Sequence, residues 1–319
     1  MTFDLFDAQR RGRFYRGNLH AHSTVSDGAL PLERVVEIYR QQGYDFVSVT
    51  DHFKDVLADT TPYRTGDFTT IIGAELHAPG LANGQKWHML GIGLPLDFAP
   101  LSEGETGQQL AQRAVNSGAF LGLAHPAHYG ATAADLLSIE CAHGIEVYNQ
   151  IAGTLNDRAW SWSQADEVLT AGRRVSLFGG DDSHFDISPW QRERGVSALD
   201  NDYQDPYPSG FNVWVWVRAE ALDPSALVDA LKAGDYYTSQ GPRFLDITLS
   251  SDRSFVDIVT TPVRSLFVSG KPFAAAQQKF GYQFTHTRFP IDDFRGSYVV
   301  ITAIDEHGMR AWSNPIWLD

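Results

Sequence analysis

Short apolar runs alternate with helical patterns along the first three quarters of this 319-residue chain, and this alternation limits its possible folds more than any other feature. Residues 45–50 (DFVSVT) and 69–75 (TTIIGAE) are rich in β-branched residues and predict strands. Between such runs lie stretches such as residues 32–39, in which apolar residues recur at helical spacing. Six or seven strand–helix units in succession predict a barrel or a large open sheet of parallel strands.

Histidines and carboxylates stand at or just beyond the C-terminal ends of these expected strands. His52 closely follows residues 45–50, and residues 119–124 (AFLGLA) run directly into His125. Functional groups collect at the C-terminal strand ends of an α/β barrel. His88 is the exception, because it lies near the start of its expected strand. The coincidence at the other strand ends favours a barrel over an open sheet.

The pattern changes near Gly241. From there on, strands such as residues 244–250 (FLDITLS) and 297–305 (SYVVITAID) are separated by turns rich in Gly, Ser, Asp or Pro, with no helical pattern between them. Such spacing is typical of an all-β module. We therefore predict an α/β fold in which residues 1–240 form a barrel and residues 241–319 form a small C-terminal all-β, sandwich-like domain.

Charge and composition argue against several classes of partner. The chain has 25 Lys and Arg against 39 Asp and Glu, a net charge of −14, which argues against non-specific binding to nucleic acid or to an anionic membrane. No run of about 20 apolar residues is present, so no membrane span is expected. The first residues lack an apolar stretch of signal-peptide length, and the single cysteine, Cys141, fits a reducing compartment. We expect a cytoplasmic protein, whose oligomeric state the sequence does not indicate.

His20 and His22 form a His-x-His pair, which on an extended strand presents two imidazoles to the same side. Neutral imidazole is the commonest protein ligand for metal ions. Such a pair on its own is more often two partly exposed histidines on a strand. Asp182 and His184 repeat the same spacing, however, and further candidate ligands follow at the other strand ends. The accumulation favours a metal site.

Six histidines and three carboxylates are candidate ligands. They are His20, His22, Asp27, His52, Glu75, His88, His125, Asp182 and His184. Nine ligands suffice for two or three divalent ions, and mixed imidazole and carboxylate shells accept Zn, Mn or Fe. Three divalent ions would outweigh three carboxylates and leave a locally positive centre, which suits a phosphate-type anion.

The motifs HAHSTVSDG, VTDH, GAE, WHML, LAHP and GDDSH, in this order, resemble those of the PHP metallohydrolases, the family named for bacterial DNA polymerases and histidinol phosphatase. The resemblance covers roughly residues 14–240. It implies a distorted (βα)7 barrel with two or three Zn, Mn or Fe ions, and hydrolysis of phosphate esters, the activity of most members. The implied ligand sets are His20, His22, Glu75 and Asp182 for the first ion, Glu75, His88 and His125 for the second, and Asp27, His52 and His184 for the third.

Two features depart from the common family pattern. GDDSH places two aspartates where one is usual, and the spacing to His184 selects Asp182 as the ligand. Asp181 would then point away, either as a structural carboxylate or as an acceptor for a ligand. GRFYRGNLHAHS and the all-β tail are also similar to a branch that contains carbaryl-hydrolase-like enzymes, which act on a carbamate ester. The branch resemblance leaves the type of ester open.

Four further residues have two interpretations each. Glu146 ends an expected strand and either faces the site or supports the fold. His77 shares its strand face with Glu75, and we interpret it as a bystander. His128 is a candidate contact to substrate, and Asp51 either orients a ligand or caps a strand end.

A phosphate substrate also requires cations, because guanidinium groups orient its oxygens. Arg192 and Arg194 follow His184 closely and are the preferred pair. Further cations near the expected site loops are Lys54, Lys86 and Arg158. A pocket lined by aromatic residues would instead favour a carboxylic or carbamate ester. The aromatic candidates are Trp87, Tyr129, Trp160, Trp162 and Trp190.

We therefore predict a metal-dependent hydrolase that acts as a phosphoesterase on a small phosphorylated molecule such as a nucleotide or sugar phosphate. A hydroxide that bridges two ions would attack phosphorus. Asp182 and His184 are the residues assigned to catalysis, with His184 as a candidate proton donor to the leaving group. The alternatives are hydrolysis of a carboxylic or carbamate ester at the same centre, and a non-catalytic metal-bound scaffold.

Overall fold

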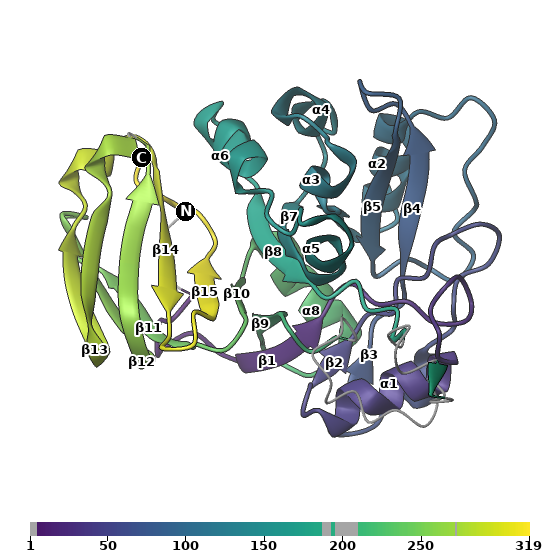
Figure 1. Cartoon of the computed structure of the whole chain (residues 1–319), viewed down its shortest axis with the longest axis horizontal. Helices are drawn as coiled ribbons and strands as arrows, with labels where there is room; N and C mark the ends of the chain where they lie inside the picture. Colours follow the sequence, from purple (N-terminus) through teal and green to yellow (C-terminus); the bar gives the residue numbers. More distant parts are fainter. Residues whose placement is uncertain (1–4, 187–192, 195–209, 272) are drawn as a thin grey trace.

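A computed structural model covers the chain, and the structure describes residues 5–186, 193–194, 210–271 and 273–319. Its strands form two sheets (Figure 1). The strands of the larger, 11-stranded sheet are β1 (Arg13–Asn18), β2 (Phe46–Val47), β3 (Thr69–Thr70), β9 (Trp214–Ala219), β10 (Tyr236–Ser239), β11 (Phe244–Leu249), β12 (Phe255–Gly270), β13 (Gln277–Pro290), β14 (Tyr298–Ile304), β15 (Arg310–Ser313) and β16 (Ile316–Trp317). Their order is β11-β12-β14-β15-β10-β9-β1-β2-β3, with β13 beside β12 and β16 beside β14.

The smaller sheet carries most of the chemistry described below. Its five strands are β4 (Gly73–Pro79), β5 (Lys86–Ile92), β6 (Phe120–Leu123), β7 (Gly144–Asn149) and β8 (Ser176–Gly180), in that order. β6, β7 and β8 run parallel to one another, whereas β5 runs antiparallel to both of its neighbours. A hairpin of only six residues, 80–85, joins β4 to β5. Such a short connection allows only an antiparallel pair, because a parallel pair needs a longer crossover.

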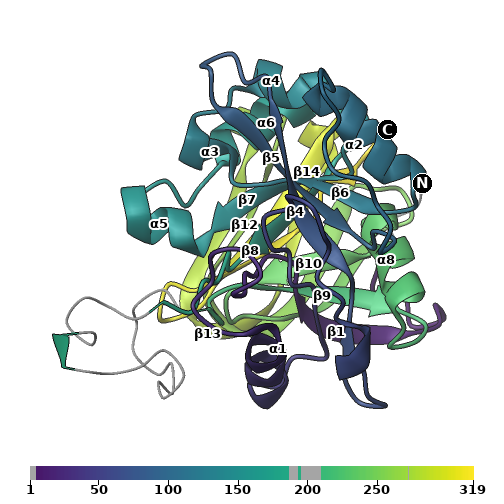
Figure 2. The same cartoon turned by 90° about the vertical axis from the view of Figure 1, so that its right-hand side faces the viewer.

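Helices pack around the strands. They are α1 (Leu32–Gln41), α2 (Gly107–Asn116), α3 (Pro126–Tyr129), α4 (Ala133–Ser138), α5 (Gln150–Asn156), α6 (Trp162–Thr170) and α8 (Pro224–Ala233). Apolar residues of α2, α4 and α6 join the outer face of the smaller sheet in the largest apolar cluster. A second cluster, which includes Phe46, Phe120 and Phe178, lies between the two sheets. Figure 2 shows α4 and α6 on the opposite side of the strands from α1. Within the part of the chain that is described, no helix is both long and apolar enough to cross a membrane.

The structure confirms a mixed α/β fold with a strand-rich C-terminal region, but it does not confirm a closed barrel of parallel strands. The strands belong to two sheets, and β5 breaks the parallel order. Two isolated parallel bridges connect the sheets: Ala21 to Ser183, both beyond strand ends, and His52, beyond β2, to Glu75 within β4. The two sheets therefore meet where the candidate ligands lie.

The antiparallel direction of β5 explains the position of His88. The start of β5 lies beside the end of β4, where His77 pairs with His88. It also lies beside the end of β6, where the backbone N–H of Ala124 donates to the carbonyl of His88 at 3.1 Å. His88 thus lies at the same sheet edge as residues that follow the C-terminal ends of the parallel strands.

The proposed boundary at residue 241 lies within a continuous sheet. β10, just before it, pairs with β15 near the C-terminus, so one sheet extends through both regions. The C-terminal strands nevertheless have an apolar cluster of their own, which includes Phe244, Leu266 and Ile301. The division into residues 1–240 and 241–319 stays a prediction.

Candidate metal centre

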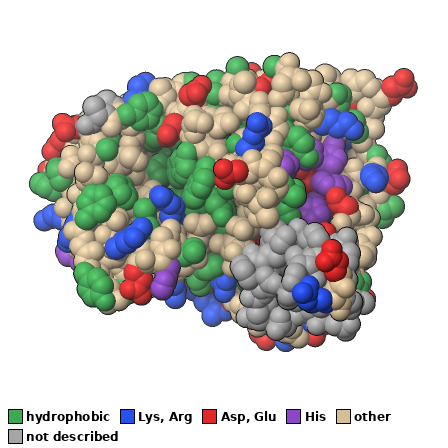
Figure 3. Space-filling view, viewed as in Figure 1, with side chains coloured by type: hydrophobic (Ala, Val, Ile, Leu, Met, Phe, Trp, Pro, Cys, Tyr) green, Lys and Arg blue, Asp and Glu red, His purple; other side chains and the backbone are tan. Residues whose placement is uncertain are grey.

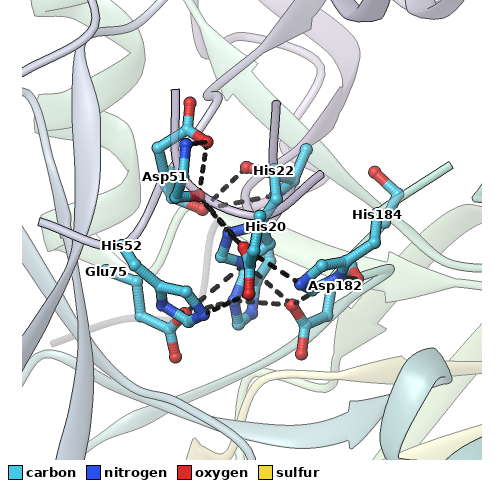
Figure 4. Close-up of polar contacts among 12 residues, drawn as sticks. His20, His22, Asp51, His52, Glu75, Asp182 and His184 are labelled. Atoms are coloured by element: carbon cyan, nitrogen blue, oxygen red, sulfur yellow. Dashed lines mark hydrogen bonds and ion pairs between the residues drawn. The ribbon is translucent and has the colours of Figure 1, made fainter. Parts of the chain in front are cut away.

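The nine candidate ligands converge at one end of the α/β region. Figure 3 shows histidine side chains gathered with acidic groups on one face of that end, and Figure 4 shows the innermost residues pointing toward one another. His20 and His22 are fully buried, and both lie beyond β1, which ends at Asn18 rather than continuing to His22 as a strand. Local hydrogen bonds hold them instead. The N–H of His22 donates to the carbonyl of Ser183 at 2.8 Å, and the N–H of Asp182 donates to the carbonyl of His20 at 2.9 Å.

Two of these positions have an unusual backbone. Asp182 has φ of 54° and His125 has φ of 27°, in a region that residues other than glycine seldom adopt. The even spacing of Asp182 and His184 therefore does not reflect an extended strand. The pairing with residues 20–22 places them, and strained backbone of this kind is concentrated at functional sites.

The first group of ligands consists of His20, His22, Glu75 and Asp182, whose ligand atoms lie within 4.8 Å of one another. Oδ1 of Asp182 is 3.2 Å from Nε2 of His20 and 2.9 Å from Nε2 of His22. Oε2 of Glu75 is 3.5 Å and 3.4 Å from the same two nitrogens. This is the set that the motifs predict for the first ion.

Glu75 lies between two groups, with one oxygen toward each. Its Oε2 faces the first group, whereas its Oε1 is 2.6 Å from Nδ1 of His88 and 3.0 Å from Nε2 of His125. A carboxylate in this position is suited to bridge two ions. The side chain is completely buried, so water does not compete for either oxygen.

The third group lies at the opening of the site. Asp27 is half exposed, and its two oxygens are 3.2 Å from Nε2 of His52 and 3.4 Å from Nε2 of His184. His22 completes a group of four whose ligand atoms lie within 4.8 Å of one another. The structure thus brings together each ligand set that the motifs imply.

Several buried atoms of this centre have no hydrogen-bond partner among the residues that are described. They are Nε2 of His20 and His22, Nδ1 of His52 and His125, and Oε2 of Glu75. A buried polar atom without a partner costs about 1–3 kcal/mol, and such atoms are uncommon in proteins. The nitrogens of His20, His22 and His52 face carboxylate oxygens, so a cation between them would satisfy these atoms. The residues present therefore fit divalent metal ions.

Hydrogen bonds on the far side of two rings fix which nitrogen faces the centre. Nδ1 of His20 donates to Oε1 of Glu146 at 3.0 Å, and Nδ1 of His184 donates to the carbonyl of Asp182 at 2.8 Å. Both bonds leave Nε2 with its lone pair toward the carboxylates, which is the tautomer that a metal ligand needs.

Glu146 resolves one of the open interpretations. It is completely buried within β7, and its Oε2 accepts from the backbone N–H of His125 at 2.8 Å and from the side chain of Asn149 at 3.0 Å. It therefore holds two ligand residues in place. Its position at a strand end was the only sequence signal for this role.

The charges of the centre are coupled. Burial opposes ionisation of Glu75, but the hydrogen bond from His125 and the charge of the His20 ring outweigh it and hold the pKa of Glu75 well below its usual value. Burial also disfavours the charged forms of His52 and His184, yet bonds to Asp27 and nearby carboxylates raise their pKa to about 10 and about 9. With no cation bound, protons on these rings balance the carboxylates.

Asp181 and Asp51 lie near the centre but have structural roles. Asp181 accepts hydrogen bonds from the side chains of Asn18 and Tyr39 and from the backbone N–H groups of residues 211–213. Asp51 accepts from the backbone N–H and hydroxyl groups of Ser23 and Ser26, which fixes the loop that carries Asp27. Asp181 thus points away from the ligands, as its place beside Asp182 predicts.

The substrate-side predictions have mixed outcomes. Arg192 lies outside the described residues, and Arg194 is exposed. The ring of His128 lies 5.4 Å from that of His125 and borders a pocket of about 340 Å³. Arg158 borders the same pocket, together with Tyr129. Arg158 therefore shares a pocket with His128, a predicted contact to substrate.

Most of the described aromatic residues that would favour a carbon ester pack into the apolar core or against Trp312. Trp87 is buried in the apolar core, and Trp160 and Trp162 pack against Trp312. Trp190 lies outside the residues that can be described. Tyr129 alone of the described candidates contacts the centre, with its ring 4.3 Å from that of His88.

Comparisons with known proteins agree with part of this interpretation. No family model matches the chain. It is 35% identical over 104 residues to the phosphoribosyl 1,2-cyclic phosphate 1,2-diphosphodiesterase of Eggerthella lenta, a match that covers 31% of this chain and 38% of that protein. The chain thus matches less than half of the length of this relative. The prediction of similarity to phosphoesterases is confirmed at this level.

The comparison with solved structures finds distant matches. A two-domain protein of Bacteroides vulgatus, described as containing a predicted PHP-like metal-dependent phosphoesterase, is 19% identical with a TM-score of 0.48, and the match covers 97% of this chain and 100% of that one. An amidohydrolase of Chromobacterium violaceum, with bound sulfate and no metal, is 16% identical with a TM-score of 0.38, over 59% of this chain and 99% of that one.

Proposed function

We propose that this protein is a metal-dependent phosphoesterase of the PHP type, which holds two or three divalent ions of Zn, Mn or Fe and hydrolyses a small phosphorylated molecule. The observation that carries the proposal is the convergence of nine ligands in overlapping groups, with buried lone pairs that lack partners. A non-catalytic scaffold would not need to retain all nine. The similarity to a phosphodiesterase supports the choice of bond.

Ions bound by this set would act as Lewis acids toward phosphate oxygens and would supply a hydroxide nucleophile near neutral pH. The side chains of the protein would set the positions of these ions. Glu75 and Asp182 fix the spacing of the first two groups, and Glu146 orients His20. Buried carboxylates on rigid strand ends need no rearrangement during the reaction, which favours catalysis by preorganisation.

His184 has a role that depends on the number of bound ions. Its Nδ1 is engaged by the carbonyl of Asp182, so only Nε2 is free to act. With three ions bound, Nε2 serves as a ligand. With two, Nε2 shares a proton with Asp27 at 3.4 Å and is placed to protonate a leaving group. Asp182 would hold an ion together with His20, His22 and Glu75.

The substrate is an anion of modest size. His128 and Arg158 border a pocket of about 340 Å³ next to the centre and would contact the non-reacting part of the substrate. The net charge of −14 favours a small phosphate ester, such as a nucleotide or sugar phosphate, over a nucleic acid.

We also propose that the two sheets of residues 1–240 correspond to a distorted (βα)7 barrel. The bridges from Ala21 to Ser183 and from His52 to Glu75 support this, because they join the sheets on both sides of the centre. Residues 241–319 would then be a C-terminal module that shares a sheet with the barrel.

Three chromogenic substrates test the choice of bond. Purified protein loaded with Zn²⁺ or Mn²⁺ is assayed on p-nitrophenyl phosphate, bis(p-nitrophenyl) phosphate and p-nitrophenyl acetate. We expect turnover of at least one phosphate ester, with loss on chelation and recovery on addition of metal. Turnover of the acetate alone would favour a carbon ester. A metal-loaded protein that is inactive on all three would support a scaffold.

A further inference from the structure

His77 is a further histidine at the centre, outside the nine candidate ligands. It lies on β4 two residues after Glu75, so both side chains extend from the same face of the strand. The strand register pairs it directly with His88 on β5. Its ring centroid is 4.2 Å from that of His88 and 4.6 Å from that of His52.

The ring of His77 lacks a structural role that would explain its position. Nε2 is buried, and no hydrogen bond to it exists within the described part of the chain. His143 provides the contrast, because its Nδ1 accepts a hydrogen bond from the backbone N–H of Leu121 at 3.0 Å. A histidine that only supported the fold would have its buried nitrogen satisfied in the same way.

Candidate ligand atoms of three other residues lie near the ring of His77. One ligand atom from each of His52, Glu75, His77 and His88 lies within 4.8 Å of the others. Ligand atoms of a tetrahedral zinc ion stand about 2.0–2.1 Å from the metal, so a small adjustment of these side chains would complete a shell. Oε2 of Glu75 is 2.8 Å from Nδ1 of His52, and Oε1 of Glu75 is 2.6 Å from Nδ1 of His88.

We propose that His77 is a direct metal ligand that, with His52, Glu75 and His88, forms a further four-donor shell in this centre. The inference rests on the proposed metal-dependent function but assigns a residue beyond it. Three imidazoles and one carboxylate make a nitrogen-rich shell, which favours Zn²⁺ over Mn²⁺. Because His52 also faces Asp27, an ion in this shell competes with one in the third group.

Anomalous diffraction from zinc-loaded crystals of the wild-type protein tests the contact without any substitution. We expect a zinc peak about 2.0–2.1 Å from Nε2 of His77. Zinc peaks at Glu75 and His88, with His77 more than about 3 Å from each of them, would overturn the inference while leaving the proposed function intact. Absence of bound zinc at neutral pH would contradict both.

Metal binding by variants gives a second readout in solution. His77→Ala and His77→Asn are compared with wild type and with His307→Ala, an exposed histidine of the C-terminal region. We expect the His77 variants to bind one zinc ion at least about tenfold more weakly, as for the loss of a ligand or of its hydrogen-bonding support, and to lose preference for Zn²⁺ over Mn²⁺. Unchanged zinc affinity in folded variants, as judged by circular dichroism, would overturn the inference. If the variants do not fold, the zinc positions in the wild-type crystal decide.

Discussion

The metal centre and the C-terminal strands use the same residue types in opposite ways. His286 and His307 of the C-terminal region have side chains 62% and 75% exposed, each beside a surface carboxylate. His20 and His22 are completely buried, and each faces three carboxylates. A histidine–carboxylate pair on a surface contributes little and can be lost without consequence. A buried cluster of such pairs needs a further charge to be stable.

The two regions also differ in how their buried polar atoms without a hydrogen-bond partner are distributed. In the C-terminal region these are scattered single atoms, such as Oγ1 of Thr260. In the centre they are adjacent nitrogens and an oxygen of residues that share a site. The C-terminal strands thus need no ion to explain their buried atoms, whereas the sheet edge that carries Glu75 has groups of side chains that fit divalent ions. The following predictions test that distinction, from the largest effect to the smallest.

His20→Ala and His22→Ala should remove metal and activity together. Loss of one or more ions removes several kcal/mol of transition-state stabilisation, which corresponds to a rate loss on the order of 10³-fold. Metal content and turnover of a phosphate ester measure the two effects. His286→Ala is the matched control and should change neither. Full activity in a His20→Ala variant would contradict the assignment.

Asp181→Ala should destabilise the fold, although Asp181 is not a candidate metal ligand. The carboxylate accepts from five donors, including the Tyr39 hydroxyl at 3.0 Å and the N–H of Asn212 at 2.8 Å. Leaving these buried groups unpaired should cost about 3–5 kcal/mol. Chemical denaturation measures the change, and Asp257→Ala at the surface should stay within about 0.5 kcal/mol of wild type. Similar losses in both variants would remove the contrast between the regions.

Glu146→Gln should weaken metal binding while preserving the fold. The amide can still face His20 but no longer holds the ring as a charged acceptor, and loss of such a partner typically costs about 10–100-fold in metal affinity. Competition with a chromophoric chelator measures the affinity. Wild-type affinity with normal stability would show that the contact to His20 does not matter for the ions.

Metal affinity should rise with pH. The carboxylates around His52 and His184 raise their pKa to about 10 and about 9, so both rings are protonated at neutral pH when no ion is bound. Binding must displace these protons, and each one displaced adds about tenfold in affinity per pH unit. Titrations at pH 6, 7 and 8 test the slope. Equal affinities at pH 6 and pH 8 would contradict proton displacement.

Arg158→Ala should have the smallest effect. Its guanidinium borders the pocket next to Tyr129 and His128 and is placed to contact substrate rather than metal. We expect KM to rise about tenfold, the equivalent of about 1.4 kcal/mol, with little change in kcat or metal content. Arg253→Ala on the C-terminal surface is the control. A fall in metal content would place Arg158 in a different role.

The ligands could be predicted from sequence because their signal is local. His20, His22 and His52 stand near predicted strand ends, and the order of the motifs resembles one family. The exception, His88, follows the same rule once β5 is known to run antiparallel. The hairpin of residues 80–85 was too short for a crossover, so its length contained this information.

Other features depend on contacts between distant segments. Asp182 was selected by assuming an extended strand, whereas its φ is 54° and the bridge between Ala21 and Ser183 places it. The contact of Glu146 with His20 joins residues 126 positions apart. His77 was interpreted as a bystander because nothing in its neighbourhood shows that Nε2 lacks a partner. Such pairings follow from tertiary packing and not from local spacing.

The most direct test of the central claim is a titration of chelator-treated protein with Zn²⁺ or Mn²⁺, in which bound metal and phosphate ester hydrolysis are measured on the same samples. The account predicts that activity returns as two or three ions bind per chain. Binding of fewer than two ions, or full activity in protein that retains none, would contradict it.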